Sequence, residues 1–467
     1  MTDPTLLTIA EAAKLIAARK LSPVELTEAC LAKTRRLDNV LSAYVEVTEE
    51  SALAAARDAE AAAAKGTLKS PLHGIPIGLK DIYDTAGVKT TGHSKLLKDR
   101  VPKEDATTVA NLKAAGAVLT GKLGTFEFAI GGPSFDILTP PARNPWNPDH
   151  TTGGSSSGSG AAVAAGLVLG AMGTDTGGSI RSPSALCGLS GIKPTYGILS
   201  RKGILPLSQS LDHAGPMCWT SEDCALMMQA LASHDPGDPA SAKVPLPDFS
   251  GAIGKPVKGL KIGLVRHFYE TDHPATDEVK AAIEASAAVF RSLGCEVVDV
   301  TLPPLADFAA VGLTIMGSEA YAIHEKSLKE SPELYGEYAR DRITLGAFFT
   351  GADYVAASYR RRELCAAVAK VMGEVDVLLT AASCFPAPRI EQVPKWFLFQ
   401  KPSITMPFNV TGLPALAVCC GYSAAGLPLS MQLVGRAFAE PTLFGLGDAY
   451  EKATPWRSRR PELTLAA

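Results

Sequence analysis

The stretches TTGGSSSGSG at 151–160 and GTDTGGSIRSP at 173–183 are the most unusual part of this sequence of 467 residues. A run of Gly and Ser by itself is typical of a flexible linker. Here the residues between the two stretches are small and apolar, which indicates that both stretches fold into a core. Consecutive glycines inside a core allow backbone conformations closed to other residues, or the close approach of a ligand. The two stretches therefore predict a close-packed functional loop.

The second stretch places a hydroxyl among several backbone donors. The N–H groups of Thr176, Gly177, Gly178 and Ser179 would face toward a hydroxyl on this loop. Preorganised N–H donors around a nucleophile form the oxyanion hole of acyl-transfer enzymes. The stretch therefore indicates acyl transfer to a serine.

A serine nucleophile needs a base, and an imidazole is the usual one. None of the eight histidines is placed in a recognisable triad pattern: His73, His93, His150, His213, His234, His267, His273 and His324. A lysine can serve if it is neutral, but an unperturbed lysine with a pKa of about 10.4 is neutral only about once in 10³ molecules at pH 7. Burial must therefore lower the lysine pKa. Lys80 follows the apolar run 75–79 and is the lysine best placed to be buried.

The flanking sequence alternates predicted helices and strands. Thr8 with Glu11, and Ser22 with Glu25, form capping boxes that begin two helices. This alternation predicts an α/β fold with a mixed, twisted sheet covered by helices on both faces. The other predicted helices are 48–66, 105–116, 160–173, 276–294 and 440–453, and the predicted strands are 74–79, 117–119, 257–265, 295–300, 375–380, 413–421 and 427–434.

Residues 303–372 are mainly helical in pattern and more charged, with RRRE at 360–363. No Gly/Ser-rich or Pro-rich linker separates this segment from the rest of the chain. We therefore expect one large domain over 1–467, in which 303–372 is a helical cover over one face of the sheet.

Composition excludes several classes of protein. The net charge of -3, with both signs scattered, favours neither nucleic acid nor a membrane surface as a partner. The nine cysteines lack the spacing of a zinc or redox site, and the first residues lack the pattern of a signal peptide. The longest small-apolar run, 160–173, is shorter than the ~20 residues that cross a bilayer. We expect a cytoplasmic protein with reduced, mostly buried cysteines.

The motifs of the chain resemble the amidase signature family. They are HGIPIGLKD at 73–81, NPWN at 144–147, GGSSSGS at 153–159, GTDTGGSIR at 173–181 and GLSGIKPTYG at 188–197. The resemblance is strongest over about 70–220 and continues more weakly in GLPALAVCCG at 412–421 and LPLSMQLVGR at 427–436. It implies the amidase signature fold and hydrolysis of a carbonyl–nitrogen bond, without a metal or an organic cofactor.

The resemblance also implies a catalytic relay. By motif, Ser179 is the nucleophile, Ser155 is a second serine whose preceding peptide bond is cis, and neutral Lys80 is the general base. Lys80 would take a proton from Ser155, which takes one from Ser179, and N–H groups of 176–179 would hold the oxyanion. Asp175 and Arg181 would support the loop.

Alternatives remain open at this point. GSSSG at 154–158 also fits the G-x-S-x-G nucleophile elbow with Ser156 at its centre, although that elbow should follow a strand. Within the resembled family, the chain could be the glutamine-hydrolysing subunit of a tRNA-dependent amidotransferase, which needs a charged pair to recognise glutamine. A non-catalytic binding protein on the same fold is the alternative from another class.

The resemblance places the acyl pocket partly in 128–135, FAIGGPSF, with Ala129, Ile130 and Gly131 as candidate substrate-binding residues. This lining is small and apolar, which favours a small, uncharged amide, aromatic amides included. The family also includes enzymes that cleave aryl esters and carbamates, so esterase and urethanase activities are further expectations. We expect the protein to act as a monomer or homodimer.

Overall fold

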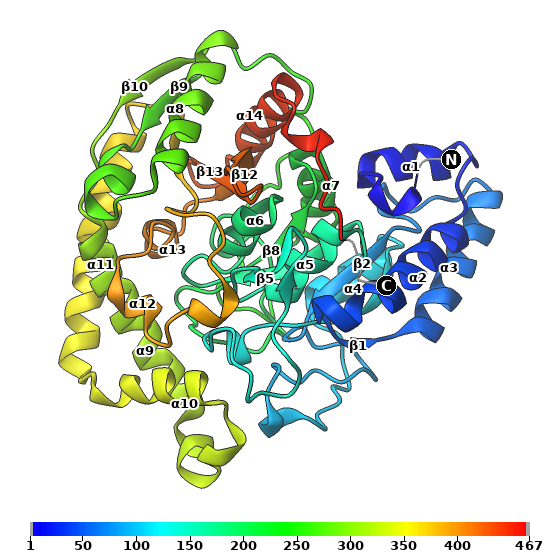
Figure 1. Ribbon diagram of the computed structural model, residues 1–467, viewed down its shortest axis with the longest axis horizontal. Helices are drawn as coiled ribbons and strands as arrows, with labels where there is room; N and C mark the ends of the chain where they lie inside the picture. Colours follow the sequence, from blue (N-terminus) through cyan, green and yellow to red (C-terminus); the bar gives the residue numbers. More distant parts are fainter. Residues whose placement is uncertain (1–2, 464–467) are drawn as a thin grey trace.

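A mixed sheet of eleven strands runs through the molecule, whose computed structural model describes residues 3–463 (Figure 1). The strand order is β1-β3-β2-β6-β8-β7-β12-β13-β11-β9-β10. The strands are β1 (Tyr44–Val47), β2 (Pro76–Lys80), β3 (Val118–Leu123), β6 (Gly170–Asp175), β7 (Ser190–Lys193), β8 (His213–Cys218), β9 (Lys261–Leu264), β10 (Glu296–Asp299), β11 (Val377–Ala381), β12 (Ala415–Tyr422) and β13 (Pro428–Gly435), while β4 (Arg143–Asn144) and β5 (Asn147–Thr151) form a separate pair.

Parallel and antiparallel pairs alternate in blocks along the sheet. Strand β2 pairs parallel with both β3 and β6, and β9 pairs parallel with β10 and β11. The strands between these blocks, from β6 through β8, β7, β12 and β13 to β11, pair antiparallel. Because β2 and β6 are parallel neighbours, the residues at their carboxyl ends meet at the same edge of the sheet.

Helices cover both faces of this sheet. At β6, a Cβ atom added at Gly170 would meet Met227 of one helix, whereas a Cβ atom at Gly173, on the opposite face, would meet Ser156 and Ile180. The helices are α1 (Ile9–Ala17), α2 (Pro23–Leu41), α3 (Glu49–Ala64), α4 (Thr107–Ala114), α5 (Ser157–Ala165), α6 (Arg181–Cys187), α7 (Ser221–Leu231), α8 (Asp277–Ser292), α9 (Leu305–Glu330), α10 (Glu337–Thr344), α11 (Gly351–Met372), α12 (Phe397–Gln400), α13 (Met406–Val410) and α14 (Glu440–Ala453).

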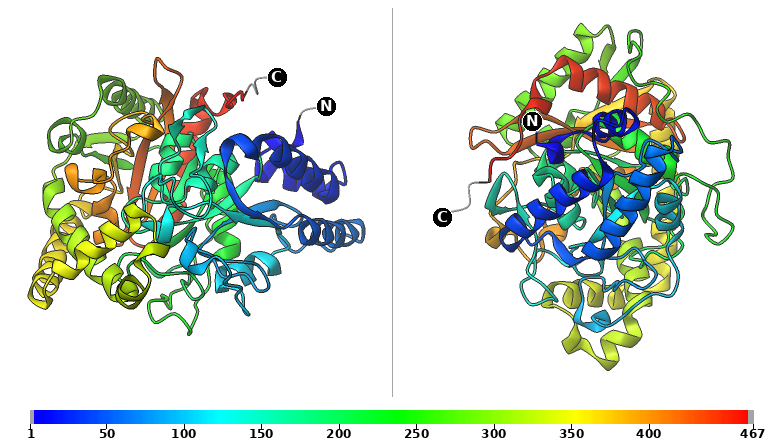
Figure 2. Two further views of the ribbon diagram at one scale, coloured as in Figure 1. Left: turned by 60° about the horizontal axis from the view of Figure 1, so that its bottom comes forward. Right: turned by 90° about the vertical axis from the view of Figure 1, so that its right-hand side faces the viewer.

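The predicted fold class is confirmed. Both capping boxes are present at the starts of α1 and α2, and α14 has the predicted bounds. Helices α9, α10 and α11 make up most of 303–372, and they lie at the opposite end of the molecule from α1–α3 (Figures 1 and 2). The assignment of the whole chain to a single domain stays a prediction.

The prediction of one buried helix over 160–173 was wrong in its second half. Helix α5 ends at Ala165, where Gly166 adopts a left-handed conformation with φ 69°, and the chain then enters β6 at Gly170. Every residue of both elements is buried, so a continuous apolar run carried no periodicity to separate helix from strand. All nine cysteines are free, and no helix within 3–463 has the length and apolar character of a membrane span.

Candidate active site

Lys80 is the last residue of β2, a strand whose five residues are all buried. Its Nζ donates to Ser155 Oγ at 2.7 Å and to Thr174 Oγ1 at 2.8 Å. Burial lowers the pKa of Lys80 from 10.5 to about 7, although the charges of Asp212 and Asp175 act in the opposite direction. A lysine held by two hydroxyls in this way can act as a base near neutral pH.

Ser155 lies on the Gly/Ser loop that leads into α5. The peptide bond between Gly154 and Ser155 is cis, as the resemblance implied. A Cβ atom at residue 154 would overlap the ring of Phe126, so only glycine fits there. Ser155 is thus placed beside Lys80 by a loop with no room for a side chain at the preceding residue.

The competing nucleophile, Ser156, has a structural position. Its side chain is fully buried, and its Oγ donates to the carbonyl of Thr174 and accepts from the N–H of the same residue, both at 3.2 Å. It precedes α5 without following a strand directly. The nucleophile-elbow interpretation therefore does not fit this loop.

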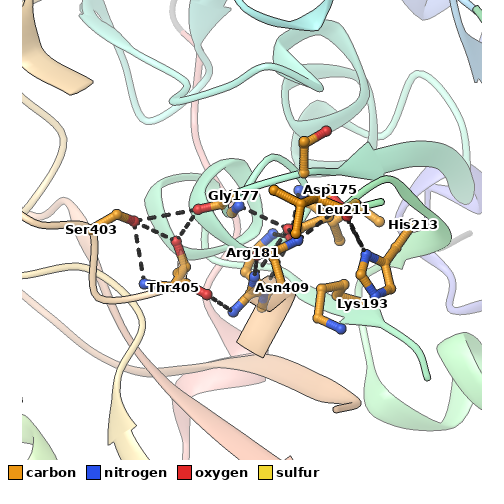
Figure 3. A network of polar contacts seen from close by, with 12 residues as sticks. Asp175, Gly177, Arg181, Lys193, Leu211, His213, Ser403, Thr405 and Asn409 are labelled. Carbon is orange, nitrogen blue, oxygen red and sulfur yellow. Dashed lines mark hydrogen bonds and ion pairs between the residues drawn. The ribbon is translucent and has the colours of Figure 1, made fainter. Parts of the chain in front are cut away.

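The loop after β6 is organised around the carboxylate of Asp175 (Figure 3). It accepts the N–H groups of Gly178 at 2.8 Å and Ile180 at 3.1 Å, and it forms a buried ion pair with Arg181 at 3.0 Å. The pKa of Asp175 is lowered despite its burial, because Arg181 stabilises the charged form. Ser179 stands within this loop and remains partly exposed.

Three N–H groups of this loop are available to an oxyanion. Within residues 3–463 the backbone N–H groups of Thr176, Gly177 and Ser179 donate no hydrogen bond. The Gly178 N–H donates to Asp175 Oδ1 at 2.8 Å. The Thr176 hydroxyl donates to Asp212 Oδ1 at 2.6 Å. The oxyanion roles of Thr176, Gly177 and Gly178 stay predictions.

Arg181 ties the loop to distant parts of the chain. Its guanidinium donates to the carbonyl of Thr405 at 2.9 Å, to Gln432 Oε1 at 3.0 Å and to Asn409 Oδ1 at 2.6 Å. Figure 3 shows Asp175, Arg181 and Asn409 together, with Thr405 beside them. These contacts fit the loop-supporting role that we predict for Asp175 and Arg181.

A cavity of about 190 Å³ has Thr174, the hydroxyl partner of Lys80, in its wall, whereas Lys80, Ser155 and Ser179 themselves do not line it. Ala129 lines it, whereas Ile130 and Gly131 do not, so the structure brings one of the three predicted substrate-binding residues to this cavity. Most of the remaining wall is apolar: Ile82, Ile204, Leu205, Pro206, Leu207 and Ala214.

The charged residues of the cavity wall already have partners. Arg201 is paired with Asp238 at 3.1 Å and donates to the carbonyl of Gln209. Asp212 accepts the N–H groups of Leu207 and Ser208, both at 2.9 Å, as well as the Thr176 hydroxyl. Burial raises the pKa of Asp212. The cavity therefore presents little uncompensated charge to a ligand.

Sequence reasoning did not identify Thr174 or Asp212 as site residues. Thr174 is the second residue of the quoted motif 173–181 and could have been suspected, but Asp212 is 36 residues from Thr176 and carried no signal. Among residues 3–463, no cluster of three or more His, Cys, Asp or Glu side chains is arranged to hold a metal ion.

Comparison with known proteins gives full-length matches. The family model described as Amidase matches residues 25–444. A glutamyl-tRNA(Gln) amidotransferase subunit of Chloroflexus aggregans is 41% identical, with 100% of both chains covered. An amidase of Pseudomonas putida is 42% identical, with 99% of both chains covered. The solved structure of a bacterial aryl acylamidase of the amidase signature family aligns with a TM-score of 0.88 and 26% identity, covering 97% of each chain.

Proposed function

We propose that this chain, which belongs to the amidase signature family, is a stand-alone amidase that hydrolyses small, uncharged amides through an acyl-enzyme on Ser179. The observation that carries the proposal is the contact of the fully buried Lys80 with Ser155 Oγ at 2.7 Å. The partly exposed Ser179 is held close to this serine loop, because its carbonyl accepts the N–H of Ser156 at 3.2 Å. The family is one of hydrolases that act on carbonyl–nitrogen bonds, and the substrate is our own inference.

The contact of Lys80 with Ser155 and the motifs shared with the family support the following mechanism. Neutral Lys80 takes the proton of Ser155 Oγ, and Ser155 takes the proton of Ser179 as the latter attacks the substrate carbonyl. The N–H groups of Thr176, Gly177 and Ser179 stabilise the oxyanion. The same relay delivers a proton to the leaving amine, and water then releases the acyl group by the reverse path.

The cavity supports an uncharged substrate. A free amino acid such as glutamine carries two charges, each of which needs a buried partner of opposite sign. Arg201 and Asp212 are the residues in the wall that could pair with these charges, and both are held by groups of this chain. An apolar acyl or aryl group matches the rest of the lining.

The similarity to amidotransferase subunits favours a second candidate, a glutamine-hydrolysing subunit that needs partner subunits. Aryl esters and carbamates present the same kind of carbonyl to the nucleophile and are further candidate substrates. A substrate panel separates these possibilities.

The nucleophile is tested by intact mass spectrometry after incubation with a fluorophosphonate, on wild type, Ser179→Ala and Ser156→Ala. We expect the adduct to be lost in Ser179→Ala alone. Loss in Ser156→Ala alone would overturn the nucleophile assignment. The wild type is then assayed on acetanilide, benzamide, an aryl ester, an aryl carbamate and glutamine. Turnover of glutamine only, and only with added partner subunits, would overturn the proposal of a stand-alone amidase.

A further inference from the structure

Arg342, on α10, is a buried cation without a carboxylate partner. Its side chain is 1% exposed, and within residues 3–463 it forms no ion pair. Burial lowers its pKa to about 10, so it stays charged at neutral pH. Burying a charge without an ion-pair partner costs free energy, so hydrogen bonds must compensate for its lost hydration.

The donors of Arg342 go to two backbone carbonyls. Nη1 donates to the carbonyl of Ile130 at 2.7 Å, and Nε donates to the carbonyl of Lys395 at 2.8 Å, where Nη2 also contacts the same oxygen. The guanidinium lies against the rings of Phe397 and Tyr338, with Cζ at 4.8 Å and 5.4 Å from their centroids. The planar fork of arginine suits such a bridge between two chain segments.

The first of these segments is the loop that leads to the cavity. Phe128 and Ala129 both adopt positive φ, 49° and 62°, a conformation that residues other than glycine rarely hold unless their surroundings impose it. Ala129 is in the cavity wall. The N-terminus of α10 also binds this loop, because the Gly336 N–H donates to Glu127 Oε2 at 2.8 Å. Helix α10 therefore holds the strained loop at both of its ends.

The second segment runs from Lys395 to the nucleophile loop. Beyond α12, Ser403 Oγ and Thr405 Oγ1 donate to the carbonyl of Gly177 at 3.3 Å and 2.6 Å. One end of this segment is thus bound to Arg342 and the other end to the residue two before Ser179. Arg342 thus links the loop that carries Ala129 to the segment that contacts the oxyanion loop. Lys395 Nζ is also paired with Glu337 and Asp341 of α10.

We propose that Arg342 is a positioning residue for the substrate pocket, which it acts on by bridging the loop 127–131 to the segment 395–405. This inference rests on the proposed amidase function and names a determinant of its selectivity. Arg342 touches neither the relay nor the reacting carbonyl. Its loss should loosen the site for bulky acyl or aryl groups and leave the relay of Lys80, Ser155 and Ser179 intact.

The test compares Arg342→Met, Arg342→Lys and Arg340→Met with wild type on acetanilide and on acetamide. Arg340 is the matched control, since it lies on the same helix, is partly exposed and pairs only with its neighbour Asp341. We expect Arg342→Met to raise KM for acetanilide by about tenfold or more, as for the loss of hydrogen bonds from a charged donor. The kcat for acetanilide, the kcat/KM for acetamide and the rate of fluorophosphonate labelling should change less than about threefold. Arg340→Met should behave as wild type.

Arg342→Lys keeps the charge but cannot bridge two carbonyls with a fork, so we expect the same direction of change with a smaller size. If Arg342→Met does not fold, Arg342→Lys decides the question. Equal losses on both amides and in labelling would show a role in general folding and would overturn the positioning role. An unchanged KM of Arg342→Met for acetanilide would also overturn the positioning role. Absence of amidase activity in the wild type would instead refute the proposed function.

Discussion

Replacing Lys80 by Ala tests the base of the relay, and the structure sets the size of the effect. Burial lowers the Lys80 pKa from 10.5 to about 7, which corresponds to about 5 kcal/mol in favour of the neutral amine. At pH 7 about half of the molecules then hold a neutral lysine, roughly 10³ times more than at the unperturbed pKa. If neutral Lys80 is the active form, kcat/KM should rise about tenfold between pH 6 and pH 8 and level off above it.

The assay is kcat/KM for an aryl amide between pH 5.5 and 9.5, together with the rate of fluorophosphonate labelling, which does not depend on an amine leaving group. Lys80→Ala should lower the acylation rate by about 10²-fold to 10⁴-fold and remove the inflection near pH 7. Glu127 is the second group to control, since burial raises its pKa to about 7 and it lies on the loop to the cavity. Glu127→Gln should keep the inflection.

Two results would refute the reasoning. Near-normal acylation by Lys80→Ala at pH 8 would exclude Lys80 as the base. An inflection that disappears in Glu127→Gln and survives in Lys80→Ala would assign the titration to the carboxyl group.

Two other predictions concern neighbouring groups. Ser155→Ala should lower kcat/KM less than Ser179→Ala does, because a water molecule can take part of the relay between Lys80 and Ser179; an equal loss in steady-state assays would contradict this. The raised pKa of Glu127 means that its stabilising contribution is full below pH 4.5 and is lost as pH rises through about 7, a loss of up to about 3 kcal/mol. Glu127→Gln keeps an acceptor for the Gly336 N–H and can donate to Ser94 Oγ. Urea unfolding should therefore show that the variant is more stable than wild type at pH 8 and has no such advantage at pH 4.5. A variant that is less stable than wild type at pH 8 would show that the carboxylate is stabilising.

The sequence by itself determined the elements whose signals are local. Capping boxes placed the starts of α1 and α2, because each box is completed by residues three apart. The glycines before Ser155 and Ser179 indicated loops with no space for a Cβ atom, and the structure puts the ring of Phe126 and the hydroxyl of Thr405 against Gly154 and Gly178. The apolar run before Lys80 indicated its burial, which is complete.

Only the tertiary structure decided which residues surround these groups. The helix α5 and the strand β6 could not be told apart in one apolar run, since both are buried on every side. The sheet places β2 beside β6 and so brings Thr174 to Lys80, although the two residues are 94 positions apart in the chain. Arg342 reaches Ile130 across 212 residues. Such contacts depend on strand order and on the packing of helices, which no local sequence pattern encodes. They determine which charged groups pair and which residues line the cavity.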